Sequence, residues 1–157
     1  MPDAAASNNE LVLTREMNVP REKLFRCWTE PALMKEWFAP RPYTTPVVET
    51  DARTGGASFI IMRSPDGQDI PLHGVYLEVV KNERIVFTDA YTRGWQPSAK
   101  PFFTGIITFA DEGGRTRLTM RSLFPTAAAR DYVVREFKAI EGGNQTLDRL
   151  GEYLGKR

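Results

Sequence analysis

The sequence has one cysteine, one histidine and no long apolar run. A single cysteine, Cys27, excludes a disulfide within the chain and fits a reducing compartment, so we expect a cytoplasmic protein. With His73 as the only histidine and no close cluster of acidic residues around it, the sequence indicates no metal site, and it indicates no cofactor. No segment approaches the roughly 18 apolar residues of a membrane-spanning helix, so we expect no membrane span.

Charge of one sign is not in excess either. The 21 Lys and Arg residues nearly balance the 20 Asp and Glu residues, and they are spread along the chain. Because nucleic-acid binding needs a concentrated basic surface, the sequence predicts no nucleic-acid partner. The first residues are small and polar and lack the apolar centre of a secretory signal. We therefore expect a flexible tail over residues 1–9 and a single domain over 10–155.

Hydrophobic periodicity predicts a sheet flanked by helices. Two short helices follow the first strand, one opened by Pro20 and the next by Pro31. Turn signals such as Ser64-Pro65-Asp66-Gly67 give hairpin-length connections, which imply antiparallel pairing. The fold class is therefore α+β, with about seven strands in one curved antiparallel sheet. Alternation of apolar and polar residues places these strands at 10–18, 44–51, 57–63, 70–80, 84–91, 102–110 and 115–124.

An apolar stripe at helical spacing marks the segment from Thr126 to Leu154. Its members are Val133, Phe137, Ile140, Leu147, Leu150 and Leu154. The stripe predicts one long C-terminal helix, roughly 40 Å in length, that covers the sheet. It skips one turn, where Gly143 and Asn144 stand. A helix over a cavity leaves such a gap, and so does a helix that kinks or packs very closely on the sheet.

Several short motifs occur in a characteristic order along nearly the whole chain. They are Trp28-Thr29-Glu30-Pro31, Trp37-Phe38-Ala39-Pro40, Gly55-Gly56, His73-Gly74-Val75-Tyr76-Leu77-Glu78, Glu141-Gly142-Gly143 and Leu147-Asp148-Arg149-Leu150. With these motifs the sequence resembles the AHSA-type branch, relatives of the activator of the 90-kDa heat-shock-protein ATPase, within the START-like (SRPBCC, Bet v-like) superfamily. The resemblance implies a helix-grip fold, in which the curved sheet wraps around the long C-terminal helix and encloses a chamber. Members of the family often carry a large aromatic residue where Gly143 stands, so its absence here implies a larger chamber.

Strand parity and the helix stripe together predict the lining of this chamber. Apolar side chains would supply the affinity and a few polar groups the orientation. We expect the ligand to be a small, largely hydrophobic, lipid-like molecule. The expected lining residues are Ile60, Met62, Tyr76, Phe87, Phe103, Ile107, Met120, Phe137, Ile140, Gly143, Asn144 and Leu147.

Three further polar residues, His73, Glu78 and Asp89, are candidates for groups inside the chamber. For Glu78 the two available arguments disagree. The apolar alternation around it places Glu78 in solvent, whereas the family pattern keeps Tyr76 and Glu78 in step on the chamber side. Nothing in the sequence sets a nucleophile beside a base, so we assign no catalytic residue. Cys27 has apolar neighbours and is typical of core packing.

Two other functions stay open. By resemblance, the protein is a chaperone-associated interaction module that uses an exposed patch. Alternatively it is a cavity-based enzyme of cyclase or hydrolase type, which would require His73, Glu78 or Asp89 to converge. Trp95, in a polar loop, is a lid, an interface anchor or a loop plug. Exposed strand edges also leave a homodimer open.

Overall fold

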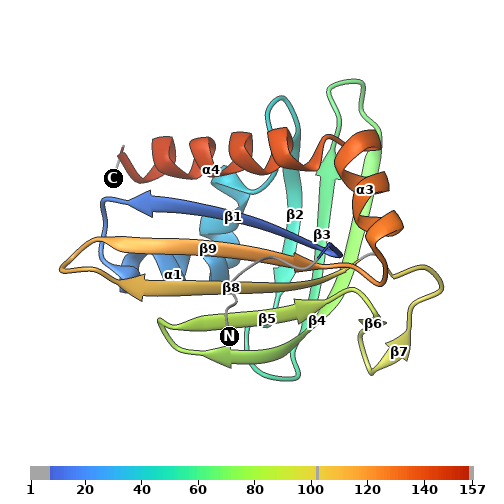
Figure 1. Ribbon diagram of the computed structural model, residues 1–157, viewed down its shortest axis with the longest axis horizontal. Helices are drawn as coiled ribbons and strands as arrows, with labels where there is room; N and C mark the ends of the chain where they lie inside the picture. The colour runs from blue at the N-terminus through green and yellow to red at the C-terminus, as the bar shows by residue number, and fades with distance from the viewer. Residues whose placement is uncertain (1–7, 102, 156–157) are drawn as a thin grey trace.

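The computed structural model describes residues 8–101 and 103–155, which form helices on one side of a curved sheet (Figure 1). The elements in chain order are β1 (Glu10–Met17), α1 (Arg21–Thr29), α2 (Pro31–Trp37), β2 (Thr44–Thr50), β3 (Ala57–Arg63), β4 (Asp69–Val80), β5 (Arg84–Thr88), β6 (Tyr91–Thr92), β7 (Gln96–Pro97), β8 (Thr104–Asp111), β9 (Thr116–Leu123), α3 (Ala127–Glu136) and α4 (Ala139–Gly155).

Seven of the described strands form one sheet in the order β1-β9-β8-β5-β4-β3-β2, and every pairing in it is antiparallel. The first strand therefore pairs with the ninth, and β1 and β2 form the two edges. The predicted α+β class and helix-grip arrangement are confirmed.

The helices α1 and α2 close one end of the core. Pro31 occupies the first turn of α2, where its missing N–H costs no hydrogen bond. The Trp37 indole donates a hydrogen bond of 3.0 Å to the Cys27 carbonyl, and it packs edge-on against Trp28 at 4.7 Å. These contacts fix the two helices relative to each other and bury Cys27 as a core residue.

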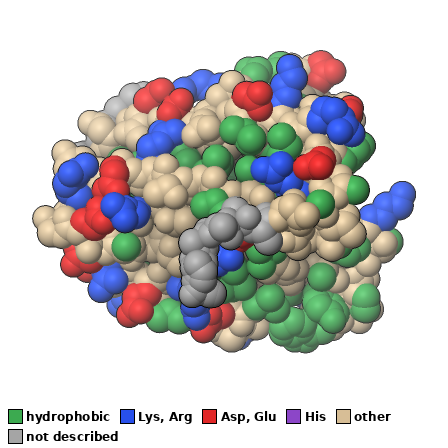
Figure 2. All heavy atoms as spheres, viewed as in Figure 1, with side chains coloured by type: hydrophobic (Ala, Val, Ile, Leu, Met, Phe, Trp, Pro, Cys, Tyr) green, Lys and Arg blue, Asp and Glu red, His purple; other side chains and the backbone are tan. Residues whose placement is uncertain are grey.

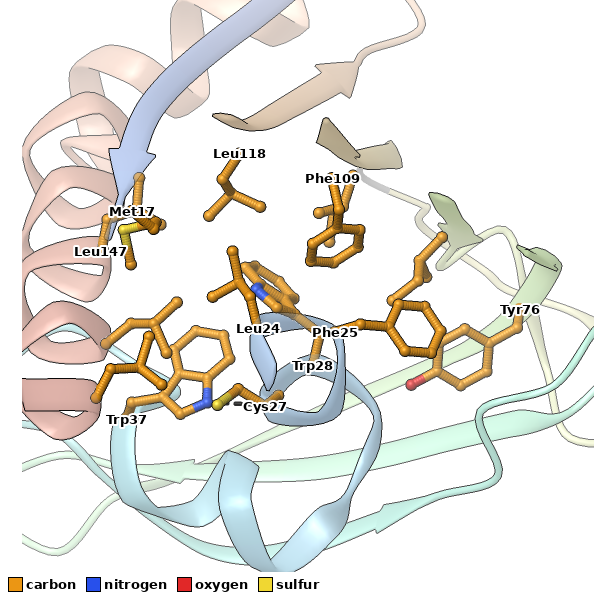
Figure 3. Packing of buried hydrophobic residues seen from close by; sticks show 14 residues of the cluster. Met17, Leu24, Phe25, Cys27, Trp28, Trp37, Tyr76, Phe109, Leu118 and Leu147 are labelled. Carbon is orange, nitrogen blue, oxygen red and sulfur yellow. Dashed lines mark hydrogen bonds between the residues drawn. The ribbon is translucent and has the colours of Figure 1, made fainter. Parts of the chain in front are cut away.

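We call the side of the sheet that faces α1, α2 and α4 the inner face, and the opposite side the outer face. The main core lies on the inner face and joins residues from α1, α2, α4 and most strands of the sheet (Figure 3). Leu24 and Trp28 of α1, Phe109 and Leu118 of the sheet, and Leu147 of α4 are all buried there. At this end the space between sheet and helices is filled.

The C-terminal segment forms two helices, where the sequence predicted one. Thr126 caps α3, since its side chain accepts a hydrogen bond of 3.0 Å from the Ala129 N–H. The chain then leaves helical geometry at Phe137 and at Lys138, whose φ is 51°. Figure 1 shows α3 set at a steep angle to α4. The prediction of a continuous helix was wrong because the spacing of apolar residues does not show where the backbone changes direction.

Two further differences concern short segments. The predicted loop after β5 contains a two-stranded sheet, in which Tyr91 pairs with Pro97 and Thr92 with Gln96. Of the predicted tail over residues 1–9, residues 1–7 lie outside the described part of the chain. Asn9 is joined to Phe124, because its side chain donates to the Phe124 carbonyl at 2.9 Å and its carbonyl accepts from the Phe124 N–H at 2.9 Å.

Candidate functional site

The inner face of the sheet carries the strand residues predicted to line a chamber. Directly opposed residues share a face, and the register opposes Tyr76 to Phe87, Ile107 to Met120, and Met120 to Leu13. Ile60 and Met62 share a face by alternation, and Ile60 packs on Met34 of α2. Strand parity therefore placed these side chains on the correct face.

These residues divide into a packed group and an open group. Ile60, Tyr76, Ile107 and Leu147 are at most 5% exposed and belong to the core. The other inner-face side chains stay half-buried although they are large and apolar: Met62, Phe87, Phe103 and Met120. The open group marks the part of the inner face that the helices leave incompletely covered.

Gly105 shapes the floor of this open part. A Cβ atom at Gly105 would lie 2.6 Å from two ring carbons of Phe87, so a larger residue would displace that ring. Phe87 in turn meets Phe103 edge-on, with ring centroids 5.6 Å apart, and Phe103 packs against Phe124 at 6.1 Å. The three aromatic rings thus form a row that runs from β5 to the residues just before β8 and just after β9.

The helix residues predicted to line the chamber take different positions. Phe137 is 59% exposed and Ile140 37% exposed, so neither is enclosed. A Cβ atom at Gly143 would overlap Cδ1 of Leu13, which means that a core-side leucine fills the space over the missing turn. The expectation of an emptier, larger chamber at Gly143 was wrong, because the glycine lets α4 approach β1 closely.

Asn144 is engaged by a residue that the sequence reasoning did not assign to the site. Arg15 of β1 forms an ion pair with Asp148 at 2.8 Å, and it donates to the Asn144 side-chain oxygen at 3.2 Å. The Asn144 amide nitrogen donates to the Ile140 carbonyl at 3.0 Å. Asn144 therefore helps to join α4 to β1. The alternation of β1, which sets Arg15 on the same face as Leu13, was the available signal.

A β-bulge decides the faces of Tyr76 and Glu78. Tyr76 opposes Phe87 and Glu78 opposes Val86, so β4 contains one extra residue, Leu77, between two successive residues of β5. Tyr76 consequently faces inward and Glu78 outward. Each of the two conflicting sequence arguments was right for one residue.

The three polar residues predicted as cavity groups lie apart from one another. Glu78 pairs with Arg84 at 2.7 Å on the outer face. His73 stacks on Phe59 on the same face, with ring centroids 4.7 Å apart. Asp89 accepts a hydrogen bond of 3.1 Å from the Phe103 N–H and so holds the loop before β8. The three do not converge on the inner face, so they do not form the polar cluster that an enzyme in the chamber would require.

Tyr76 brings a polar group to the inner face. Burial raises the pKa of its phenol above the usual value of 10.0, although hydrogen bonds to the side chains of Ser58 and Thr50 act in the opposite direction. Ser58 opposes Gly74 and Thr50 opposes Ser58, so the three hydroxyl groups come from adjacent strands. They form a small polar cluster beside the aromatic rings.

Two open hollows lie elsewhere, around the end of β2 and over the outer face of β3. Their volumes are about 480 and 360 Å³, and both are lined by Glu49, Ala57 and Arg93. Sequence reasoning missed this region, since no motif links β2 to the turn between β6 and β7. The fold alone brings them together.

The described part of the chain contains no helix long and apolar enough to cross a membrane. Within residues 8–101 and 103–155, no three His, Cys, Asp or Glu side chains are grouped as ligands for a metal ion.

Comparison with known proteins identifies the family. The family model described as activator of Hsp90 ATPase homolog 1-like protein matches residues 18–155. The chain belongs to this family. The predicted resemblance is thereby confirmed, whereas a search of curated proteins finds no match.

Several solved structures share the fold of this chain. A crystal structure of a protein from Nitrosomonas europaea is 30% identical in sequence, with a TM-score of 0.91 and 97% of each chain covered. A solution structure from Staphylococcus epidermidis is 25% identical, with a TM-score of 0.81 over 99% of this chain and 94% of that one. An AHSA1 protein from Silicibacter pomeroyi is 20% identical, with a TM-score of 0.73 over 93% and 97%.

Proposed function

We propose that the protein binds a small, largely apolar ligand on the open part of its inner face. The observation that carries the proposal is the half-burial of four large apolar side chains that all face the helices: Met62, Phe87, Phe103 and Met120. Side chains in that position are normally buried, so they offer surface that a ligand can cover.

The packing of α4 explains why this surface is open. Apart from its contact with α3, the helix packs mainly on β1 at one edge and on α2 at the other. Its buried leucines, Leu147, Leu150 and Leu154, all lie in its C-terminal half. The N-terminal half has no buried leucine of its own and contacts β1 through Gly143, and exposed Phe137 and Ile140 lie where α4 joins α3.

Binding there would follow from the hydrophobic effect. Covering about 100 Å² of apolar surface contributes about 2.5 kcal/mol, so four partly exposed side chains can hold a ligand of modest size. Tyr76 and its bonded hydroxyl groups supply a polar contact for orientation.

Mass spectrometry and a dye titration test this function. Native mass spectrometry of protein purified without denaturation should detect a co-purifying apolar molecule. Anilinonaphthalene sulfonate should bind saturably, and Phe137→Gln and Ile140→Gln should each weaken it about three- to tenfold. Val12→Gln is the control, because Val12 is also apolar and is 39% exposed, close to Ile140 at 37%, but lies on the outer face of β1. Equal loss in all three variants, or no loss in either helix variant, would contradict the proposal.

A second candidate is an interaction with an Hsp90 ATPase, for which the family is named. The observation that favours it is an exposed aromatic pair, Tyr91 and Trp95, whose rings meet edge-on at 5.6 Å. Figure 2 shows hydrophobic side chains gathered at the lower right, where β6 and β7 lie in Figure 1. Tyr91→Ser with Trp95→Ser should abolish binding to Hsp90 while anilinonaphthalene sulfonate binding persists. Failure of the unmodified protein to bind Hsp90 would remove this candidate.

We also propose that the protein is cytoplasmic and that it can form a homodimer. The single buried cysteine supports a cytoplasmic location. A homodimer would use the edge strands β1 or β2. Sedimentation velocity over a range of protein concentrations tests the dimer, since a constant monomer mass would exclude it.

A further inference from the structure

A cleft lies around the end of β2 and over the outer face of β3. Its two hollows of about 480 and 360 Å³ adjoin through the residues they share, Glu49, Ala57 and Arg93. The loop between β2 and β3 forms one wall, and the turn between β6 and β7 forms the other. Left-handed Gly94 and Trp95, with φ of 74° and 60°, shape the turn that holds Arg93 there.

Two stacked rings form the floor of the smaller hollow. Phe59 and His73 oppose each other across β3 and β4, with ring centroids 4.7 Å apart and planes 33° from parallel. Glu49 opposes Phe59 on β2, so all three side chains lie on the same face. A partly aromatic surface thus ends at a carboxylate.

The cleft contains charges of both signs that have no partner among the described residues. Glu49 of β2 and Arg93 of the turn both line the two hollows, and neither forms an ion pair with any residue of 8–101 or 103–155. By contrast, Asp51 and Arg53 at the rim pair with each other at 2.8 Å. An unpaired carboxylate and an unpaired guanidinium in one cleft complement a ligand that carries the opposite two charges.

We propose that this cleft binds a small zwitterion with a flat ring, of the chemical class of a free aromatic amino acid. Arg93 holds the carboxylate, Glu49 holds the ammonium group, and the ring contacts Phe59 and His73. The volume falls in the range of small-molecule sites. Glu49 disfavours a simple anion such as phosphate, and Arg93 disfavours a simple amine, so the two together select a molecule with both charges.

Isothermal titration calorimetry of the full chain with L-phenylalanine tests this site. We expect saturable binding, and about tenfold weaker binding of 3-phenylpropionate, which lacks the ammonium group, and of phenethylamine, which lacks the carboxylate. Arg93→Gln and Glu49→Gln should each lower the affinity for L-phenylalanine about tenfold. Lys81→Gln is the control, because Lys81 is an exposed cation in the distant turn between β4 and β5.

The three substituted side chains are exposed, so these variants should fold, which circular dichroism verifies. A dissociation constant above about 10 mM for L-phenylalanine would overturn the proposal, and so would equal affinity for all three ligands. Amide chemical-shift mapping should place the changes at Ala57, Phe59 and Thr92; changes confined to the inner face would also overturn it. Because anilinonaphthalene sulfonate probes the inner face with different variants, failure of one proposal leaves the other standing.

Discussion

Gly143 is where α4 comes closest to β1. The Leu13 side chain occupies the space that a Cβ atom at Gly143 would need, whereas nothing lies within 4 Å of a Cβ atom at Gly151 on the same helix. The two glycines therefore separate two effects, helix propensity and steric fit, that act on one element.

We expect Gly151→Ala to raise the free energy of unfolding by up to about 1 kcal/mol, because alanine favours the helix. The free energy of unfolding of Gly143→Ala should be at least about 1 kcal/mol lower than that of Gly151→Ala, because the added methyl group overpacks the contact with Leu13. Urea denaturation measures both. In a Leu13→Ala background the two alanine substitutions should become equal, and a persisting difference would show that Leu13 is not the cause.

Tyr76 links stability to alkaline pH. Its folded-state pKa is raised by burial, so the folded state favours the neutral phenol, and the stability that this group contributes is present below about pH 10 and is lost above it. Tyr76→Phe should cost about 1 kcal/mol at neutral pH through the lost hydrogen bonds to Ser58 and Thr50. Above pH 10 the difference in free energy of unfolding between the unmodified protein and Tyr76→Phe should become smaller. Urea denaturation across that range measures this, and a constant gap would argue against burial as the cause.

The orientation of single residues was predictable where alternation is regular. Leu13 and Arg15 on β1, and Ile107 on β8, lie on the expected sides because a strand has a period of two. Tyr76 and Glu78 were not predictable together, because the bulge between them adds one residue to β4 alone. The bulge residue Leu77 and its neighbours Tyr76 and Glu78 include no glycine or proline that would mark such a bulge.

Among the elements, the junction of α3 and α4 carries local backbone strain. Lys138 adopts a φ of 51°, which glycine adopts without the cost of roughly 1–2 kcal/mol that other residues meet. Its carbonyl also accepts the Gly142 N–H at 2.8 Å, so the residue starts α4 while it ends the turn.

Lys138→Gly should therefore raise the free energy of unfolding, by up to about 1 kcal/mol, although glycine usually destabilises. Lys35→Gly is the comparison, because Lys35 is an exposed lysine inside α2 and its replacement should lower stability by about 1 kcal/mol. Chemical denaturation of both variants distinguishes the cases. Equal losses would show that the junction is not strained.

Elements with strong boundary signals were predictable. Pro31, Thr126 and the Ser64–Gly67 turn each act through local chemistry that is independent of the rest of the fold. The break at Lys138 and the β6–β7 hairpin were not, because an ordinary lysine and a tryptophan take left-handed conformations there. Such conformations depend on tertiary contacts that the sequence does not display.

At the scale of the whole molecule, the helices differ in how firmly the core holds them. No residue of α3 is buried, whereas Leu147, Leu150 and Leu154 anchor the second half of α4. We expect backbone amides of α3 to exchange with deuterium much faster than those of α4 around Leu150. Hydrogen exchange followed by mass spectrometry measures this. Equal protection would mean that α3 unfolds only with the whole domain.

The candidate site could also be predicted only in part from the sequence. Periodicity identified which side chains face inward, among them Phe87 and Met120. It could not show which of them the helices cover, because that depends on how α1, α2 and α4 fill one end of the sheet. The outer cleft depends on contacts between loops far apart in the chain, for which a single sequence holds no signal.

The meeting of the first and last elements has a consequence for biosynthesis. β1 pairs with β9 and also supports α4, so the core needs both ends of this domain at once. A nascent chain on the ribosome therefore cannot complete its core until residues 147–154 have emerged. Until then the apolar side of α1, with Phe25 and Trp28, lacks its final cover. Productive folding of this domain thus awaits the synthesis of α4.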